Sequence, residues 1–178
     1  AEVVPFENNS IEGSNSVLER DWNRYMEDVA RANILICNID AVTDNSLTTA
    51  ERAQYKAEAK IFRAMIMFDM VRLWGDFPVI TTVAEDITSD NIEDVYPQYF
   101  PEQNTELEAY QQIERDLLDA VQYAPDNTPE NKTLFTKSVA RTLLAKIYAE
   151  KPLRDYTKVI QYCDEVKADG FDLVDDFS

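Results

Sequence analysis

The most regular apolar pattern in the chain lies between Thr48 and Thr81. Apolar residues recur there at steps of three and four, and neither Gly nor Pro occurs before Gly75, which predicts one helix of about 26 residues, about 39 Å long. From Ile61 onward the helix is apolar on nearly all sides, so we expect it in the core. Thr48 three residues before Glu51 predicts a capping box at its start, and Gly75 predicts a left-handed residue at its end.

Three charged residues interrupt this apolar surface: Arg63, Asp69 and Arg72. An unpaired charge is costly in a core, so each of them is expected to have a partner. Asp69 lies three residues before Arg72 and Asp76 lies four after it, which puts both carboxylates within reach of that guanidinium. We therefore predict that Asp69, Arg72 and Asp76 form a structural ion pair at the helix end, not a ligand site.

The same periodicity predicts four more helices. They run from about Ser16 to Val42, from Thr105 to Pro125, from about Thr136 to Lys151, and from near Asp155 to Gly170. Thr105 lies three residues before Glu108, which predicts a second capping box. A turn of only a few residues makes the first two long helices an antiparallel hairpin. The pattern thus predicts an all-α fold of antiparallel helix hairpins joined by irregular loops.

Several side chains in these helices have predicted environments. Trp22 lies on an apolar stripe, which favours the core over a sugar platform. Arg31 and Asn33 are candidates for hydrogen bonds to the long central helix. Cys37 and Cys163 lie inside helices without a CxxC motif, which predicts two buried thiols and leaves a disulfide open. In the last helix the residues predicted to face inward are Tyr156, Val159, Ile160, Cys163 and Val166.

Two segments lack a helical period. Residues 1–15 are polar and are predicted to be irregular. Residues 82–104 form a long acidic loop that contains Tyr96, Tyr99 and Phe100, and loops of this length are usually functional or mobile. Aromatic rings stack on the apolar faces of sugars, and neighbouring carboxylates and amides bind hydroxyls. The three rings are therefore candidate sugar contacts; the alternative is that they fold back onto the helices.

Composition narrows the classes of function. The 178-residue chain has a formal net charge of -17, which argues against a nucleic-acid binder because such proteins need a basic face for phosphate. The same charge disfavours docking onto an anionic membrane surface. The chain has 3 Gly and neither a GxGxxG nor a Walker motif, so no phosphate-cradling loop is predicted. Neutral ligands, cationic ligands and protein partners remain.

No residue pattern predicts catalysis or a cofactor. The sequence contains no His, the commonest general base and metal ligand. Asp and Glu total 34, so chance pairs are expected, and none stands out as the facing carboxylates that a glycosidase needs. The acids of the long loop lack the spacing of an EF-hand. The chain is predicted to be non-catalytic, with no cofactor and no metal site.

Three separated stretches resemble the SusD/RagB family, nutrient-capture lipoproteins on the outer membrane of Bacteroidota. Residues 58–81 (EAKIFRAMIMFDMVRLWGDFPVIT) resemble the family signature, residues 24–39 resemble the helix before it, and residues 136–174 resemble a helical-repeat pair with its following tail. The resemblance covers most of residues 20–177, in the family's order. It departs from the family at residues 154–156, where Arg-Asp-Tyr stands in place of a Gly-Asp-Tyr turn.

For the fold, the resemblance implies one SusD-like helical domain over residues 1–178, with a tetratricopeptide-like second half. Its parts would be the irregular segment 1–15, the signature hairpin 16–81, the acidic aromatic loop 82–104, and the helices and tail 105–178. Family members begin with a signal sequence and a lipid-bearing cysteine and continue much further. We therefore expect this chain to be an internal or N-terminal-half fragment of a longer protein.

For function, the resemblance implies a non-catalytic cell-surface protein that binds an oligosaccharide or another nutrient. It would deliver that ligand to a SusC-like TonB-dependent transporter, held at the outer membrane only by a lipid anchor that this chain lacks. The family's sugar site uses the stretch before the first long helix, which adds Phe6, Asn8 and Asn9 as candidate contacts. The alternative is a helical-repeat scaffold for protein association, with exposed aromatic rings along the repeat groove.

Overall fold

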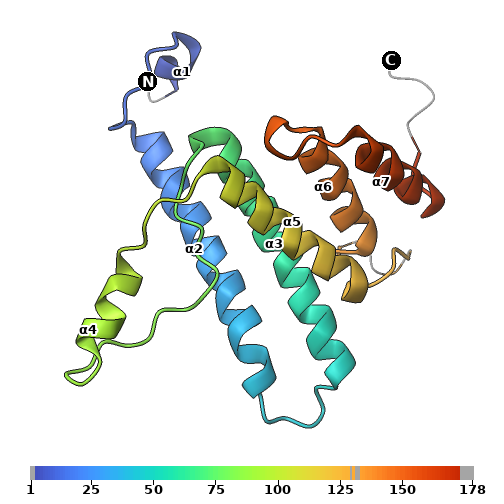
Figure 1. Ribbon diagram of the computed structural model, residues 1–178, viewed down its shortest axis with the longest axis horizontal. Coiled ribbons are helices and arrows are strands. Elements are labelled where there is room, and N and C mark those ends of the chain that lie inside the picture. The colour runs from blue at the N-terminus through green and yellow to red at the C-terminus, as the bar shows by residue number, and fades with distance from the viewer. Residues whose placement is uncertain (1–2, 129, 131–132, 173–178) are drawn as a thin grey trace.

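The computed structural model describes residues 3–128, 130 and 133–172, and the described chain is built from helices (Figure 1). The α-helices are α1 (Val4–Glu7), α2 (Ser16–Asn38), α3 (Thr49–Trp74), α4 (Ile92–Val95), α5 (Glu106–Tyr123), α6 (Lys137–Ala149) and α7 (Tyr156–Ala168). Short 3-10 helices lie at η1 (Ile39–Ala41), η2 (Tyr96–Tyr99) and η3 (Lys151–Leu153). The described residues contain no strand, so the all-α prediction is confirmed.

Helix α3 is the centre of the fold. It contacts α2, α5 and α6, and its neighbours α2 and α5 both run antiparallel to it (Figure 1). Ile61, Ala64, Met67 and Met70 are completely buried, and each large apolar side chain of this kind contributes about 1.5–3 kcal/mol on burial. Helix α6 packs on α5, and α7 packs on α6 as the outermost element.

The ends of α3 follow from its sequence. Thr48 donates its N–H to Glu51 Oε2 at 2.8 Å and accepts the N–H of Glu51 on Oγ1 at 3.2 Å, so the predicted capping box forms. Thr105 and Glu108 form the same box at the start of α5. Gly75 has the predicted positive φ of 72°, but its ψ of -115° lies outside the left-handed helical region. This angle turns the chain out of the helix and toward α5.

A buried polar lock joins the three long helices. Arg63 of α3 donates to both carboxylate oxygens of Asp116 on α5, at 2.8 and 2.7 Å. Its third nitrogen donates to Asn33 Oδ1 on α2 at 2.6 Å and to the carbonyl of Thr81 at 3.3 Å. All three of these side chains are buried. The prediction for Asn33 is confirmed, whereas Arg31 is exposed and pairs within α2, because it points away from α3.

The predicted ion pair at the end of α3 forms only in part. Arg72 Nη1 lies 3.9 Å from Asp69 Oδ1, and the two side chains are 54% and 46% exposed, so this is a surface contact. The prediction that Asp76 completes it is wrong, because the turn at Gly75 carries its carboxylate to the start of α5. There it accepts the N–H of Glu106 at 2.7 Å. The guanidinium of Arg72 instead lies 5.2 Å from the centre of the Phe68 ring.

The outer elements correct three further predictions. Residues 1–15 contain the short helix α1, in which Pro5 occupies the first turn. The predicted inward face of α7 is wrong in part. Tyr156 and Ile160 are 61% and 63% exposed, because α6 alone cannot cover that face, whereas Val159 packs against the core as predicted. Cys37 and Cys163 are both free and exposed, so the prediction of two buried thiols is also wrong. The part of the tail after residue 172 lies outside the described residues.

Candidate ligand-binding surface

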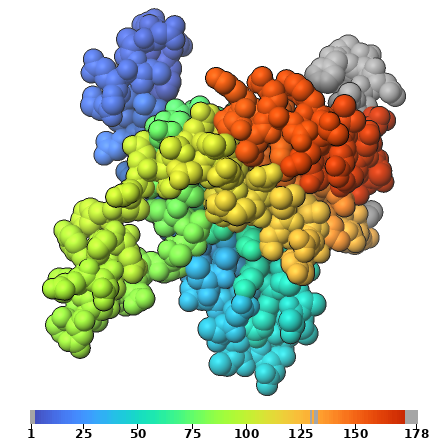
Figure 2. All heavy atoms as spheres, viewed as in Figure 1, coloured from blue at the N-terminus to red at the C-terminus, as the bar shows by residue number. Residues whose placement is uncertain are grey.

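The long acidic loop folds into a projecting arm, which we define as residues 83–101. It contains α4 and η2, which contact each other and no other described helix. Asn91 organises its tip, since Oδ1 accepts the N–H of Thr88 at 2.7 Å and Nδ2 donates to the carbonyl of Asp86 at 3.1 Å. Buried Val95 gives the arm a small core of its own. The arm stands off from the body of the molecule and joins it at its base (Figure 2).

The three aromatic residues of the arm divide into two groups. The rings of Tyr96 and Phe100 lie 4.8 Å apart at a tilt of 44°, and these residues are 53% and 65% exposed. Ile92 beside Tyr96 is exposed as well, so the outer side of the arm is a small apolar platform. Tyr99 lies at the base, where its hydroxyl donates to the carbonyl of Glu85 at 2.9 Å. None of the three rings is buried against the helices.

A cavity of about 300 Å³ lies between the arm and α2. One wall is α2, which contributes Met26, Ala30 and Ile34, and the other is the base of the arm, which contributes Gln98 and Tyr99. These side chains are apolar apart from the amide of Gln98 and the hydroxyl of Tyr99, and Asn33 and Thr82 add polar groups to the lining. The cavity was not foreseen from the sequence, because it depends on how the arm leaves the extended segment that follows Pro78.

The second set of predicted contacts lies elsewhere. Phe6 is half-buried within α1, while Asn8 and Asn9 are exposed just after it, and Asn9 has a positive φ of 52°. Figure 1 shows α1 beyond the N-terminal end of α2, well separated from α4 and η2. The structure therefore does not bring Phe6, Asn8 and Asn9 together with the aromatic residues of the arm.

The field around the arm is strongly negative. The sequence has neither Lys nor Arg between Arg72 and Arg115, while the arm itself carries Glu85, Asp86, Asp90, Glu93 and Asp94. Phosphorylated or sulfated ligands would be repelled here, and neutral or cationic ligands would not. Within the described part of the chain, no group of three potential ligands is placed to hold a metal ion.

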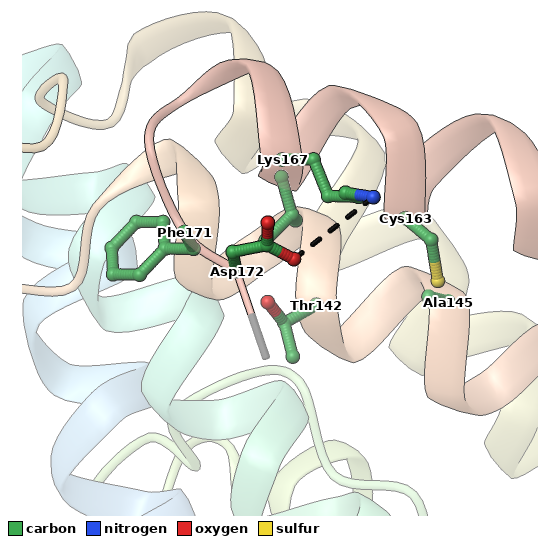
Figure 3. Close-up of a pocket in the computed structure, with 7 residues that line it drawn as sticks. Thr142, Ala145, Cys163, Lys167, Phe171 and Asp172 are labelled. Atoms are coloured by element: carbon green, nitrogen blue, oxygen red, sulfur yellow. Dashed lines mark ion pairs between the residues drawn. The ribbon is translucent and has the colours of Figure 1, made fainter. Parts of the chain in front are cut away.

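A second concave surface lies between α6 and α7 (Figure 3). This groove has a volume of about 310 Å³, and its lining includes Ala145, Cys163 and Phe171. Lys167 and Asp172 face each other across its rim at 3.9 Å. The groove is apolar and exposed because α7 lacks a cover on this side. The sequence did not predict this groove, because the apolar stripe of α7 was expected to be buried.

The most perturbed titratable groups belong to packing, not to either surface. Burial raises the pKa of Tyr148 well above its usual value, and its hydrogen bond to Glu114 raises it further. Lys158 donates to the Tyr148 hydroxyl at 3.1 Å and lies 4.3 Å from the centre of its ring. Burial likewise raises the pKa of Tyr110 to about 12. These groups tie α5, α6 and α7 together and lie outside both concave surfaces.

The fold agrees with comparisons to known proteins. Residues 3–149 match the SusD-like family described as starch-binding and associating with the outer membrane, and the chain belongs to this family. A SusD-like protein of Bacteroides ovatus is 33% identical over 129 residues, which is 71% of this chain and 21% of that protein. The chain therefore spans about a fifth of the length of this curated relative.

Solved structures support the same fold. A SusD-like protein from Bacteroides fragilis aligns with a TM-score of 0.76 and 26% identity, over 94% of this chain and 30% of its own. A laminarin-binding SusD-like protein aligns with a TM-score of 0.70 and 25% identity, over 88% of this chain and 32% of its own. A SusD superfamily protein from Bacteroides thetaiotaomicron aligns with a TM-score of 0.76 and 21% identity, over 96% of this chain and 37% of its own. The helical, tetratricopeptide-like architecture is thus that of SusD-like proteins.

None of the helices in the described ranges is long and apolar enough to cross a membrane.

Proposed function

We propose that this chain is part of a non-catalytic glycan-binding protein at the outer-membrane surface, and that its arm contributes aromatic contacts to the sugar. The observation that carries the proposal is the exposed pair of Tyr96 and Phe100, whose rings lie 4.8 Å apart. Paired rings of this kind offer an apolar surface to a pyranose face, and the neighbouring carboxylates of Glu93 and Asp94 are acceptors for hydroxyls. Affinity would come from stacking and hydrogen bonds rather than from charge.

The ligand class follows from the negative field and from the relatives. A neutral oligosaccharide suits an arm without basic residues. The family description names starch, and one structural relative is named as laminarin-binding, so neutral glucans are the first ligands to test. In the whole protein, the bound glycan would pass to a SusC-like TonB-dependent transporter, and a lipid anchor would hold the protein at the cell surface. Phe6, Asn8 and Asn9 would contact ligand only as a separate subsite.

Calorimetric titration with starch- and laminarin-derived oligosaccharides tests the role of the arm. Replacing Tyr96 and Phe100 together by Ala removes the platform, and we expect binding to weaken at least about tenfold. Tyr123→Ala is the matched control, because Tyr123 is as exposed as Tyr96 but lies at the end of α5. Equal affinity of the double variant and the control for these oligosaccharides would show that the arm does not contribute to sugar binding.

The groove between α6 and α7 favours a second candidate function, protein association. Exposed Tyr156, Ile160 and Phe171 lie on or beside α7, where a helical-repeat scaffold would present contacts to a partner helix. A scaffold without a sugar site predicts that Ile160→Glu abolishes complex formation in cell extract of the source organism while the Tyr96 and Phe100 substitutions change nothing. The opposite pattern supports the glycan-binding proposal.

A further inference from the structure

The cavity between α2 and the arm has a composition that suits an apolar group better than a sugar ring. Its α2 wall presents Met26, Ala30 and Ile34 at helical spacing, and Ile34 is 53% exposed although it borders a hollow. Val83 at the base of the arm is exposed in the same way. Apolar side chains that remain open to water around a hollow gain free energy when a ligand covers them.

Two polar side chains at the cavity, Asn33 and Tyr99, are committed to the protein itself, and Thr82 adds a hydroxyl to the lining. Asn33 gives its Oδ1 to Arg63 and its Nδ2 to the carbonyls of Ile80 and Thr82, at 2.9 and 3.3 Å. The hydroxyl of Tyr99 is used by Glu85. A sugar ring placed inside would leave several hydroxyls without partners, which is costly. Gln98 is different, since its Oε1 accepts a long hydrogen bond of 3.4 Å and its amide nitrogen makes none within the described residues.

We propose that this cavity binds a ring-sized apolar substituent, aryl or short acyl, carried by the saccharide that the outer platform holds. A volume of about 300 Å³ accommodates such a group. Tyr99 supplies a ring face, and the Gln98 amide supplies one hydrogen bond to an ester or ether oxygen. Tyr96 and Phe100 lie on the same arm, so one decorated glycan could contact both places. This inference rests on the proposed function, but its apolar half is testable without any sugar.

Ala30 allows a clean test, because it is an exposed helical residue that lines the cavity. Ala30→Phe fills the hollow from the surface of α2 without disturbing the core. Ala168→Phe, at an exposed position on α7, is the matched control. Binding of p-fluorophenol is followed by fluorine NMR, and binding of p-nitrophenyl and methyl β-glucosides is followed by calorimetry, for the wild type and both variants.

We expect saturable binding of p-fluorophenol that Ala30→Phe reduces at least about tenfold and Ala168→Phe leaves unchanged. We also expect the p-nitrophenyl glucoside to bind at least about tenfold more tightly than the methyl glucoside, with the difference lost in Ala30→Phe. Phenol binding that is absent, or insensitive to Ala30→Phe, overturns the inference whatever the glucosides do. Phenol binding that depends on Ala30, together with no saccharide binding, upholds the cavity and counts against the glycan proposal.

Discussion

At the residue scale, the fold depends on one fully paired charge. Arg63 is the cation of α3 that the core encloses, and its contacts reach α5, α2 and the segment after Pro78 at once. The sequence predicted a partner for each charge in this helix, but it named carboxylates only for Arg72 and none for Arg63. The signal that would have found the pair is Asp116, an acid flanked by Ile113 and Leu117 on the apolar stripe of α5.

We expect Arg63→Met to destabilise the protein by about 3–5 kcal/mol, because it leaves the Asp116 carboxylate buried without its counter-charge. Arg72→Met is the control, since the contact of Arg72 with Asp69 is exposed and contributes at most about 1 kcal/mol. Urea unfolding followed by circular dichroism measures both. The double variant Arg63→Met, Asp116→Leu should recover much of the loss. Equal effects of Arg63→Met and Arg72→Met would contradict the structural role of the lock.

At the element scale, local sequence signals were sufficient to predict where the helices begin and end. They were not sufficient to predict features that depend on how one element packs against another. Both capping boxes and the span of α3 follow from residues within one turn of each end. The exposed face of α7 and the fold of the arm were not predictable, because an apolar stripe in the sequence does not identify which element, if any, packs against it. The cavity beside Tyr99 was not predictable for the same reason, since α2 forms it together with residues between positions 80 and 101.

The two capping boxes predict a specific dependence on pH. The side-chain and backbone hydrogen bonds of Thr48 lower the pKa of Glu51 from its usual 4.5, and the backbone and side-chain hydrogen bonds of Thr105 do the same for Glu108. A lowered carboxyl pKa contributes stability that is present above the ordinary pKa and is lost as the pH falls through the folded-state pKa. We expect Thr48→Ala, Thr105→Ala to be less stable than the wild type at neutral pH.

The difference between the double variant and the wild type should shrink as the pH falls through the lowered folded-state pKa values of Glu51 and Glu108, because both carboxyls then become protonated in the wild type as well. Urea midpoints at a series of pH values measure it. Thr157→Ala, at an exposed position in the first turn of α7, should show no such convergence. A difference that stays constant across the acid range would show that the caps act without their carboxylates.

At the scale of the whole molecule, shape and charge divide the chain into a helical body and an acidic projection. The body is the SusD-like architecture that the three resembling stretches predicted. The candidate site was predicted less well than the fold. Phe6, Asn8 and Asn9 were candidate sugar contacts together with the aromatic residues of the arm, but α1 and α4 lie far apart in the structure (Figure 1). Proximity between distant segments is a property of the whole fold, which local patterns do not report.

The net charge of -17 predicts that salt stabilises the folded state, because screening weakens the repulsion between like charges. Between about 20 and about 300 mM NaCl we expect the Tm to rise by a few degrees. The variant Asp90→Asn, Asp94→Asn removes two charges of the arm that have no basic neighbour in the sequence, and it should respond less to salt. Scanning calorimetry measures both, and a Tm that falls with added salt would contradict the expectation.

The separation of the arm from the other helices bears on how such a protein diversifies. Substitutions at its exposed positions leave the Arg63 lock and the α3 core untouched, so under the proposed function they would change the contacts with ligand with little effect on folding. A library randomised only at the exposed positions of residues 87–100, with Asn91 and buried Val95 kept, would therefore yield mostly folded members. Natural variation should accumulate at these positions for the same reason, because the packing of the helical body does not constrain them.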